Sequence, residues 1–527
     1  MSYIKKLGLL FNTVRYLKPI QIRYRLKYFI KNRFGKKNSF EPVTTVSIDN
    51  LSILKFQQSI YNAETFKSGN SFTFLNLNHT FSNGIDWNFP NYGRLWTYNL
   101  NYFEYLNQKD ISVNEGLKLI DEYIKTIDNN TTRQEPYPIS LRIMNWIRFF
   151  ITNGINDLSY NGYLLAQLQL LRDLKEYHLL GNHLLENGFA FLFGAYYFND
   201  ASLYKEAKSI LVPELIEQIL RDGAHFELSP MYHNLMTNRV LDCYNLVSSN
   251  NLFDKELLSL LKEKAEVMLG FIKKITYRNG DIPLMNDAAF GVAPTSKELL
   301  EYAKRLGLHI RENELSDSGY RKFESDNYEL VFDIGEVGPT YQPGHAHADT
   351  LSFELHINNR PVIIDTGTST YEVNDIRFYE RSTRAHNTVT INGENSSEIW
   401  AGHRVGRRAH VQVLVDEPNH VKARHDGYNK HFGVDHTREI IAMISGVIIK
   451  DDLNGKTGVA HLHFAPNEVF EKVGNEVIGN DYKIVFTNHQ SIEIINTYYS
   501  PEFNKRVECV SLNISFAGKL TTQIMCY

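Results

Sequence analysis

Side chains that could bind a divalent cation gather in one region of the second half of the sequence. His345 and His347 stand one residue apart, Asp365 ends a hydrophobic run, and His386 comes further along. Imidazoles and a carboxylate are ligands that Zn²⁺ takes, usually with water in any vacant position. In an extended segment His345 and His347 project from the same face, so one can bind the ion while the other faces a neighbouring site. The alternative is that these are ordinary hydrogen-bonded or surface histidines, of which the chain has 19.

A second group of polar residues follows a glycine in the first half of the chain. Asn182 comes directly after Gly181, and His183 and Glu186 are spaced to share one face of a helix. Asn182 is therefore expected as the N-cap. An amide, an imidazole and a carboxylate at a helix start suit the binding of a substrate carboxylate. The alternative is that helix capping and polar residues at the surface account for the same string.

Tyr232 is a candidate for proton transfer. It stands in the run Ser-Pro-Met-Tyr-His, where Pro230 is expected in the first turn of a helix. A phenol has a pKa of ~10, and nearby cations that lower it would let Tyr232 act as a general acid or base. A half-buried packing residue is the alternative.

The elements that must position these residues fall into two groups. Residues 95–306 show helical spacing, with breaks at Gly or Pro near Gly154, Gly181, Pro213, Gly223 and Gly280. Expected helices are 114–126, 141–152, 160–180, 183–198, 203–220, 231–249 and 254–276. Short alternating runs follow from 328 to the end, for example 350–365, 408–415, 438–450, 461–464, 483–487 and 491–495. A helical domain followed by an antiparallel sheet domain is therefore predicted.

Composition agrees with two large domains. At 527 residues the chain exceeds what one hydrophobic core usually organises, and 43% hydrophobic with 22% charged residues is typical of a globular protein. We expect an N-terminal segment and linker at 1–50, a helical domain at 51–320 and a β domain at 321–527. The cysteines Cys243, Cys509 and Cys526 are odd in number and far apart, so the sequence predicts neither a disulfide framework nor a cysteine-based metal site.

The N-terminal segment is strongly basic. Residues 1–37 carry eleven Lys or Arg and no acidic residue, which leaves 45 basic against 60 acidic side chains in the rest of the chain. Apolar residues recur there at helical spacing: Tyr3, Leu7, Leu10, Phe11, Val14 and Leu17. Such a helix either lies on an anionic membrane surface or docks its apolar stripe on the acidic body. Nucleic acid is not an expected partner, because the basic run belongs to no recognisable reading module.

The same segment bears on the expected location. Its longest apolar stretch is too short for a signal peptide and no cleavage pattern follows, and no stretch of the chain approaches the ~20 apolar residues of a membrane span. We expect the protein in the cytoplasm or peripherally at the inner membrane.

Several motifs in a fixed order together resemble the heparinase II/III family of polysaccharide lyases. They are 98–102 (YNLNY), 136–146 (PYPISLRIMNW), 182–188 (NHLLENG), 229–233 (SPMYH), 344–349 (GHAHAD) and 386–389 (HNTV). The resemblance implies an incomplete (α/α) toroid followed by an antiparallel β-sandwich, with a uronate-containing substrate between them. The basic N-terminal segment departs from the secreted lyases and is similar to family members linked to bacterial surface polysaccharides. The substrate therefore stays open between a glycosaminoglycan-like and a bacterial surface polysaccharide.

The chemistry that the resemblance implies is β-elimination at a uronic acid unit. The proton on C5 is weakly acidic until the adjacent carboxylate is neutralised, so the site needs donors there, a base for C5–H and an acid for the departing O4. By motif position, Asn182 and His183 would engage the carboxylate, with Glu186 orienting them. Tyr232 would be the acid, and His345 the base or a stabiliser of charge.

The resemblance also implies a structural metal. One Zn²⁺ per chain would be held by His347, Asp365 and His386, bracing the sandwich against the toroid. Tyr379 is a candidate second catalytic phenol. Arg142 and Arg381 are candidate ligands for anionic sugar groups, and structural salt bridges are the alternative for both.

Two other classes of function remain open at this stage. A glycoside hydrolase on the same toroid would need two carboxylates across the scissile bond, ~5–10 Å apart, and Glu186 with Asp287 is the pair that we nominate. A non-catalytic polysaccharide-binding protein of a capsule, O-antigen or exopolysaccharide pathway is the other. Release of an unsaturated sugar would separate the lyase from both.

Overall fold

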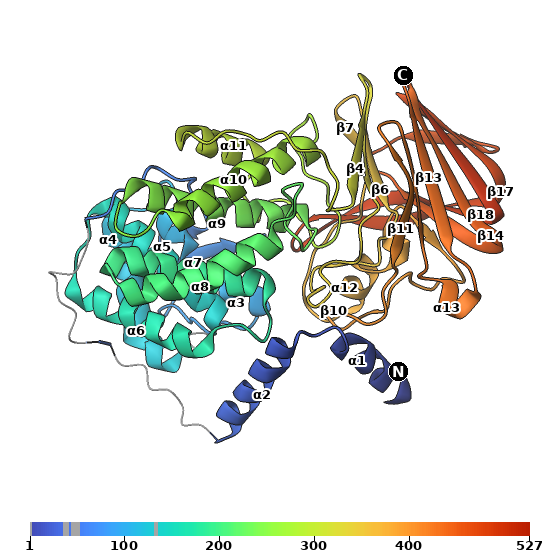
Figure 1. The fold of residues 1–527 in the computed structure, drawn as a ribbon. Coiled ribbons are helices and arrows are strands. Elements are labelled where there is room, and N and C mark those ends of the chain that lie inside the picture. The colour runs from blue at the N-terminus through green and yellow to red at the C-terminus, as the bar shows by residue number, and fades with distance from the viewer. Residues whose placement is uncertain (1–2, 35–41, 44–52, 131–134) are drawn as a thin grey trace.

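The computed structural model describes residues 3–34, 42–43, 53–130 and 135–527. Figure 1 shows a helical domain, coloured blue to yellow-green, beside a β domain coloured yellow to red. Helices therefore precede strands, in the order that the change of periodicity predicts.

The helical domain is built from antiparallel neighbours joined by short connections. Its helices are α3 (Arg94–Tyr102), α4 (Val113–Thr126), α5 (Pro136–Asn153), α6 (Leu158–Leu174), α7 (Gly181–Phe198), α8 (Ala201–Gln218), α9 (Pro230–Ser249), α10 (Glu256–Ile275) and α11 (Ser296–Arg305). Local sequence explains several boundaries: Ser112 and Thr295 form capping boxes at α4 and α11, and α9 begins with Pro230 behind the cap residue Ser229. The predicted helices are confirmed to within a few residues at most ends.

Two helix predictions are wrong in detail. α8 continues through Pro213, where we expected a break, because the packing of its buried face outweighs one lost backbone hydrogen bond. α6 ends at Leu174 rather than near residue 180, because Lys175 turns to extended backbone with ψ 134°.

α7 runs through the middle of the domain. Every residue of α7 except His183 is buried, so this helix packs into the core of the domain on nearly all of its sides. A small antiparallel sheet, not predicted, covers the domain before α3. Its strands are β1 (Phe66–Lys67), β2 (Ser71–Phe74) and β3 (Leu77–Thr80).

The β domain contains two antiparallel sheets. The larger has the order β11-β12-β13-β14-β18-β17-β16-β15 with β8 beside β14, and the smaller has the order β4-β5-β6-β7. Leu330 and Leu355 of the smaller sheet share one hydrophobic core with Ile449 and Leu512 of the larger sheet. Two antiparallel sheets that face each other across one core form a β-sandwich, as predicted.

The bounds of the β domain elements are as follows. The smaller sheet has β4 (Tyr320–Glu324), β5 (Tyr328–Asp333), β6 (Phe353–Ile357) and β7 (Arg360–Ile363). The larger sheet has β8 (Val389–Thr390), β11 (Val411–Glu417), β12 (His420–His425), β13 (His436–Met443), β14 (Gly446–His463), β15 (Phe470–Val473), β16 (Glu476–Gly479), β17 (Tyr482–Glu502) and β18 (Lys505–Cys526). A separate two-stranded ladder joins β9 (Ile399–Trp400) and β10 (Arg404–Val405), and the short helices are α12 (Asp375–Glu380) and α13 (Asn429–Phe432).

The histidine-rich run between β5 and β6 is a loop, not the extended segment that we expected. Its backbone does not join a ladder. Ala348 N–H donates to the Arg381 carbonyl, and Ser352 N–H donates to the backbone carbonyl of Asp349. Leu351 takes a left-handed φ of 64°. The loop can therefore turn its side chains toward the helical domain.

Two helices precede both domains, α1 (Tyr3–Val14) and α2 (Pro19–Phe34). α1 lies against the β domain, where Asn12 Nδ2 donates to Glu398 at 3.0 Å. α2 lies against the helical domain, where Gln21 Nε2 donates to the Leu179 carbonyl at 3.0 Å. Among the helices of the described residues, none combines the length and the apolar composition that crossing a membrane requires.

Candidate active site

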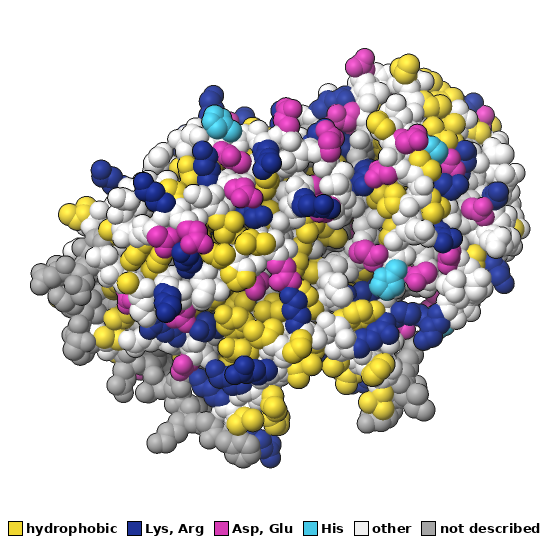
Figure 2. All heavy atoms as spheres, viewed as in Figure 1, with side chains coloured by type: hydrophobic (Ala, Val, Ile, Leu, Met, Phe, Trp, Pro, Cys, Tyr) yellow, Lys and Arg dark blue, Asp and Glu magenta, His cyan; other side chains and the backbone are white. Residues whose placement is uncertain are grey.

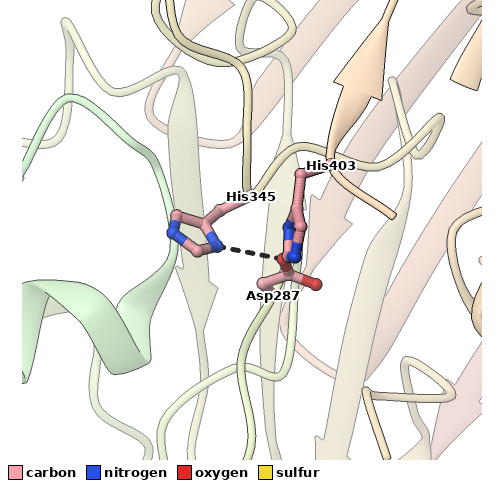
Figure 3. Close-up of side chains that lie close together, drawn as sticks. All are labelled: Asp287, His345 and His403. Atoms are coloured by element: carbon pink, nitrogen blue, oxygen red, sulfur yellow. Dashed lines mark hydrogen bonds and ion pairs between the residues drawn. The ribbon is translucent and has the colours of Figure 1, made fainter. Parts of the chain in front are cut away.

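The carboxylate of Asp287, in the segment between α10 and α11, binds four side chains of the β domain, the weakest contact being a donation from Thr368 Oγ1 at 3.4 Å. Arg377 on α12 donates to both oxygens, with Nη2 at 2.8 Å from Oδ2. His345 Nδ1 lies 3.0 Å from Oδ2 and His347 Nε2 lies 2.9 Å from Oδ1. Figure 3 shows His345 and His403 flanking this carboxylate. Burial opposes the charge, but Arg377 and the two histidines hold the pKa of Asp287 well below its usual range, so it is ionised.

Backbone contacts fix the same arrangement. Asp287 N–H donates to the His345 carbonyl at 3.0 Å, and His347 N–H donates to Asn286 Oδ1 at 3.0 Å. Ser229, the cap of α9, donates its hydroxyl to the Asp287 carbonyl at 2.7 Å. The histidine loop, the segment before α11 and the start of α9 are thus held as one unit.

Asp287 also determines which nitrogen of His345 is free. Because Asp287 is an ionised acceptor, His345 Nδ1 carries the proton, and the lone pair of Nε2 remains available. Glu227 Oε2 is 3.7 Å from Nε2, too far for a hydrogen bond. His345 is partly exposed, so this nitrogen can reach a bound molecule.

Two phenols lie next to His345. The ring of Tyr232 stacks on the His345 ring with centroids 3.8 Å apart and an interplanar angle of 28°. The hydroxyls of Tyr232 and Tyr371 are 3.2 Å apart. Burial raises the pKa of both phenols, so both are neutral and carry a proton that can be donated.

Asn182 connects the helical domain to this cluster through Glu227. Glu227 Oε1 accepts from Asn182 N–H at 3.0 Å, and Glu227 Oε2 accepts from Asn182 Nδ2 at 2.9 Å. The same Oε2 atom is the one nearest His345. One carboxylate therefore orients the amide of Asn182 beside the imidazole of His345.

His183 is the one side chain of α7 that is not buried. Its Nδ1 lies 2.9 Å from Glu176 Oε1. Partial burial opposes protonation, but the Glu176 carboxylate and its hydrogen bond outweigh this effect and raise the pKa of His183. The pair places an imidazole that is readily charged at the surface of the helical domain, near the Asn182 amide.

Family models match most of the chain. The model described as Heparinase II/III N-terminus matches residues 137–306, and the model described as Heparinase II/III-like, C-terminal matches residues 311–526. The chain belongs to the heparinase II/III-like family. The two matches meet between α11 and β4, where the helical domain gives way to the β domain.

Individual relatives of this heparinase II/III-like chain agree. A heparin-sulfate lyase of Bacteroides stercoris is 25% identical over 323 residues, which cover 55% of this chain and 46% of that protein. A heparin-sulfate lyase of Pedobacter heparinus is 26% identical over 309 residues, 51% of this chain and 45% of that protein. The match thus spans about half the length of these curated relatives.

Solved structures share the fold at low sequence identity. A crystal structure of heparinase III superposes with a TM-score of 0.66 at 16% identity, covering 96% of this chain and 91% of that chain. A chondroitinase AC lyase reaches a TM-score of 0.50 at 9% identity, covering 82% of this chain and 75% of that chain. The heparinase II/III-like chain therefore has the predicted (α/α) toroid followed by a β-sandwich.

The structure brings together four of the predicted catalytic residues of this heparinase II/III-like protein but changes how they are oriented. They are Asn182, His183, Tyr232 and His345. Asn182 is not the N-cap of α7, because Leu180 holds that position. Glu186 does not orient the other two, because its Oε1 accepts from Arg239 at 3.1 Å. Glu227 and Glu176 take that role instead.

The structure corrects the substrate-binding role predicted for Arg142 and Arg381. Both side chains are fully buried. Arg142 Nε donates to Gln167 at 2.5 Å, and Arg381 Nη2 donates to the Ala346 carbonyl at 2.9 Å. Their donors therefore satisfy buried acceptors, and neither presents charge to a bound polysaccharide.

Tyr379 lies apart from the cluster. Its hydroxyl is 2.7 Å from Thr497 Oγ1 on β17. The second phenol that contacts Tyr232 is Tyr371, which sequence reasoning did not select. Arg377 covers the Tyr371 ring with its carbon Cζ 4.9 Å from the centroid.

The predicted zinc ligands are neighbours in this heparinase II/III-like protein. His386 Nδ1 is 2.7 Å from Asp365 Oδ2, and the ring centroids of His347 and His386 are 5.2 Å apart. Three buried ligand atoms here have no hydrogen-bond partner among the described residues of the chain: His347 Nδ1, His386 Nε2 and Asp349 Oδ2. Two imidazole nitrogens and a carboxylate oxygen without partners are a donor set that fits Zn²⁺. His347 Nε2 faces Asp287, so closing these atoms on one ion requires the rings to move.

A different trio comes closer together. Within the described residues, Asp287, His345 and His403 have ligand atoms that all lie within 4.8 Å of one another. Arg377 already donates to both oxygens of Asp287, so a cation there would stand against a buried guanidinium. Repulsion between the two positive charges makes this trio the poorer metal site.

The same contacts count against the hydrolase alternative. Asp287 is fully buried and shared by Arg377, His345 and His347, so it has no oxygen free to protonate a leaving group or attack a sugar. Glu186 is buried against Arg239. Neither carboxylate has the access that glycoside hydrolysis requires.

Proposed function

We propose that the protein is a polysaccharide lyase that cleaves a uronic-acid-containing acidic polysaccharide by β-elimination. One observation carries the proposal: an imidazole with a free nitrogen, two neutral phenols and an amide from the other domain all lie around one position. They are His345, Tyr232, Tyr371 and Asn182. The relatives named as heparin-sulfate lyases support the same class of reaction.

Neutralising the substrate carboxylate is the task of the helical domain. The Asn182 amide is oriented by Glu227, and His183 has a raised pKa beside Glu176. Because Nδ1 of His183 faces Glu176, Nε2–H points away from that carboxylate and can donate to a uronate. Donors placed before the reaction stabilise the negative charge that develops as the C5 proton leaves.

Proton transfer is the task of the residues around Asp287. His345 Nε2 accepts the C5 proton while Asp287 stabilises the resulting imidazolium through Nδ1. The electron pair of the C5–H bond forms the C4–C5 double bond, and the C4–O4 bond breaks. Tyr232 donates its hydroxyl proton to the departing O4, and Tyr371, 3.2 Å away, stabilises the phenolate by hydrogen bonding.

The substrate class follows from these charges. The site offers His183 and Asn182 to an anionic group, and the phenols and imidazole to the adjacent sugar carbons and leaving oxygen. We propose a glycosaminoglycan-like or bacterial surface polysaccharide that contains a 4-linked uronic acid. A panel of such polymers, with a neutral glucan as control, would identify it.

The test measures the ultraviolet absorbance of the unsaturated product. Tyr232→Phe keeps the ring and its packing but removes the proton donor, so the rate should fall by about 10²–10⁴-fold. Asn182→Ala should lose about 10²–10³-fold, and the two losses should not add, because they serve one transition state. Tyr244→Phe, on the same helix α9, is the control and should match the parent.

Two outcomes would contradict the proposal. New reducing ends without the unsaturated sugar would mean hydrolysis. Binding of the polymers without any cleavage by the parent protein would favour a non-catalytic role.

We also propose one structural Zn²⁺ per chain, held by His347, Asp365 and His386 together with Asp349, whose Oδ2 has no hydrogen-bond partner among the described residues. The bound ion would supply positive charge to this buried acidic region and so stabilise the fold. His386→Ala and Asp365→Ala should each lose the metal and lower the melting temperature. His461→Ala, another buried histidine of the sandwich, should keep the metal. Elemental analysis that finds no metal in active parent protein would contradict this proposal.

A further inference from the structure

The N-terminal helices turn their apolar faces away from the protein. Both helices are docked, yet large hydrophobic side chains on them remain exposed: Leu7, Leu10, Phe11 and Val14 on α1, and Ile20, Ile22, Leu26, Phe29 and Ile30 on α2. A surface helix of a globular protein normally buries that stripe. Contiguous exposed apolar patches of this kind mark interaction sites.

The outward direction of the apolar face is clearest on α2. Its contacts with the helical domain come from one face. Gln21 and Tyr28 hydrogen-bond to backbone carbonyls, the Tyr24 ring packs on Tyr177, and Lys31 forms an ion pair with Asp173. The residues at 22, 26, 29 and 30 follow the spacing of a single stripe on the opposite face. Phe29 in this stripe is 62% exposed.

α1 repeats the same arrangement on the β domain. Leu9 is buried, and Asn12 and Thr13 hydrogen-bond to Glu398 and to the Val405 carbonyl. The residues at 7, 10, 11 and 14 again form one stripe on the far side, where Phe11 is 69% exposed. The helix therefore docks through its polar face, not through the apolar stripe that the docked alternative required.

Positive charge flanks both stripes. Lys6 and Arg15 lie on either side of the α1 stripe, and Arg23, Arg25 and Lys27 border the α2 stripe, all exposed. Neither helix contains an acidic residue. Within the described residues, none of these five side chains forms an ion pair. Their charge is therefore available to an external partner.

The two stripes lie at one edge of the molecule. Figure 1 shows α1 and α2 one after the other along the lower edge, diverging from the segment that joins them, beneath the β domain and the helical domain respectively. Figure 2 shows hydrophobic and basic side chains together on the portions of this edge that are not grey. A single flat partner can therefore contact both helices.

We propose that α1 and α2 bind the surface of an anionic lipid bilayer, with the apolar stripes inserted at the headgroup boundary and the flanking Lys and Arg on the acidic headgroups. This geometry is that of an interfacial amphipathic helix. A second copy of the chain is a poorer partner, because it would bring the same basic side chains together. The proposal does not depend on the catalytic assignment.

Binding of both helices to a bilayer would also fix the position of both domains, because each helix is docked on a different domain. α1 is attached to the β domain and α2 to the helical domain, so a bilayer bound to both would hold the two domains at a fixed distance from its surface. The protein would act as a peripheral membrane protein.

The experiment is flotation of the full chain with vesicles. Vesicles of phosphatidylcholine and phosphatidylglycerol should bind the protein, vesicles of phosphatidylcholine alone should bind much less, and binding should weaken from ~0.1 M to ~1 M salt. The double variant Arg23→Gln with Lys27→Gln should lose about five-fold in partitioning per charge. Phe11→Ser with Phe29→Ser should lose binding altogether. These side chains point away from the body, so the melting temperature should not change.

A matched control uses exposed hydrophobic residues elsewhere. Ile444 is 93% exposed and Val469 is 72% exposed, both in the β domain, so Ile444→Ser with Val469→Ser should bind vesicles like the parent. Equal binding to neutral vesicles, or no binding to anionic ones, would overturn the proposal. Light scattering that finds a dimer lost in the Phe11, Phe29 variant would assign the face to a second copy instead.

Discussion

The helical side and the β side of the site hold their charged side chains in different ways. On the helical side three carboxylates hold separate partners: Glu176 with His183, Glu227 with Asn182, and Glu186 with Arg239. On the β side a single carboxylate, Asp287, holds Arg377, His345 and His347 together. The first arrangement divides the contacts among three carboxylates, and the second gathers them on one residue.

The difference matters for how each side responds to change. Contacts divided among separate carboxylates should fail one at a time, because the loss of one carboxylate leaves the other two in place. A shared carboxylate couples its partners, so its loss should affect the base, the predicted metal ligand His347 and a buried arginine at once. The helical side, which we propose binds the substrate carboxylate, should therefore tolerate mutation better than the side around Asp287, which we propose transfers protons.

The largest expected effect comes from breaking the network. Asp287→Asn should leave the buried Arg377 without its counter-ion and cost about 3–5 kcal/mol in the free energy of unfolding. Loss of the acceptor that fixes His345 should reduce the rate by about 10²–10⁴-fold. Thermal melting and initial rates on the polymer substrate measure the two effects.

The matched control breaks a buried carboxylate–arginine pair on the helical side. Glu186→Gln leaves Arg239 with Glu104, whose Oε1 is 3.0 Å away, so stability should fall less and the rate should stay within about ten-fold of the parent. Equal losses of rate in both variants would remove the proposed distinction between the two sides.

A smaller effect, which depends on pH, is expected from the pair of His183 and Glu176. Since the pKa of His183 is raised in the folded state above its ordinary value of 6.5, its pairing with Glu176 stabilises the protein fully below that value. The stabilisation, and the positive charge available to a uronate, should disappear as pH rises through the raised pKa. His183→Gln should lower kcat/KM by about ten- to a hundred-fold near neutral pH and flatten this alkaline decline.

The pH comparison has its own control. Tyr232→Phe should keep the alkaline decline while losing rate. A parent profile without any decline above pH ~6.5, or an identical decline in His183→Gln, would show that the charge of His183 is not used.

The smallest effect should distinguish the two candidate second phenols. Tyr371→Phe removes the hydroxyl 3.2 Å from that of Tyr232, so the rate should fall by about five- to thirty-fold, the value of one hydrogen bond of ~1–2 kcal/mol. Tyr379→Phe removes a bond to Thr497 on β17 and should leave the rate unchanged. A larger rate loss for Tyr379→Phe would return the catalytic role to that residue.

The sequence by itself determined the order of the domains and most of the elements. Helical spacing in 183–198 and 231–249 predicted α7 and α9, because burial of one face leaves a period in the chain. Alternation predicted one extended run at 438–450, where the structure has β13 and the start of β14 paired as a hairpin. The motifs also selected Asn182, His183, Tyr232 and His345, which share a site in the structure. These signals are local or depend on fixed residue types, so they can be read along the chain.

Only the tertiary structure decided what orients these residues. Asp287 lies 58 residues from His345 and 90 from Arg377 along the chain, and Glu227 lies 45 residues from Asn182. No spacing predicts such partners, because carboxylates, amides and guanidinium groups are common on surfaces, and burial together is what gives their pairing its strength. The direction of the α1 and α2 stripes was undetermined for the same reason. Periodicity shows that a helix has an apolar face, but packing against the two domains decides which way that face points.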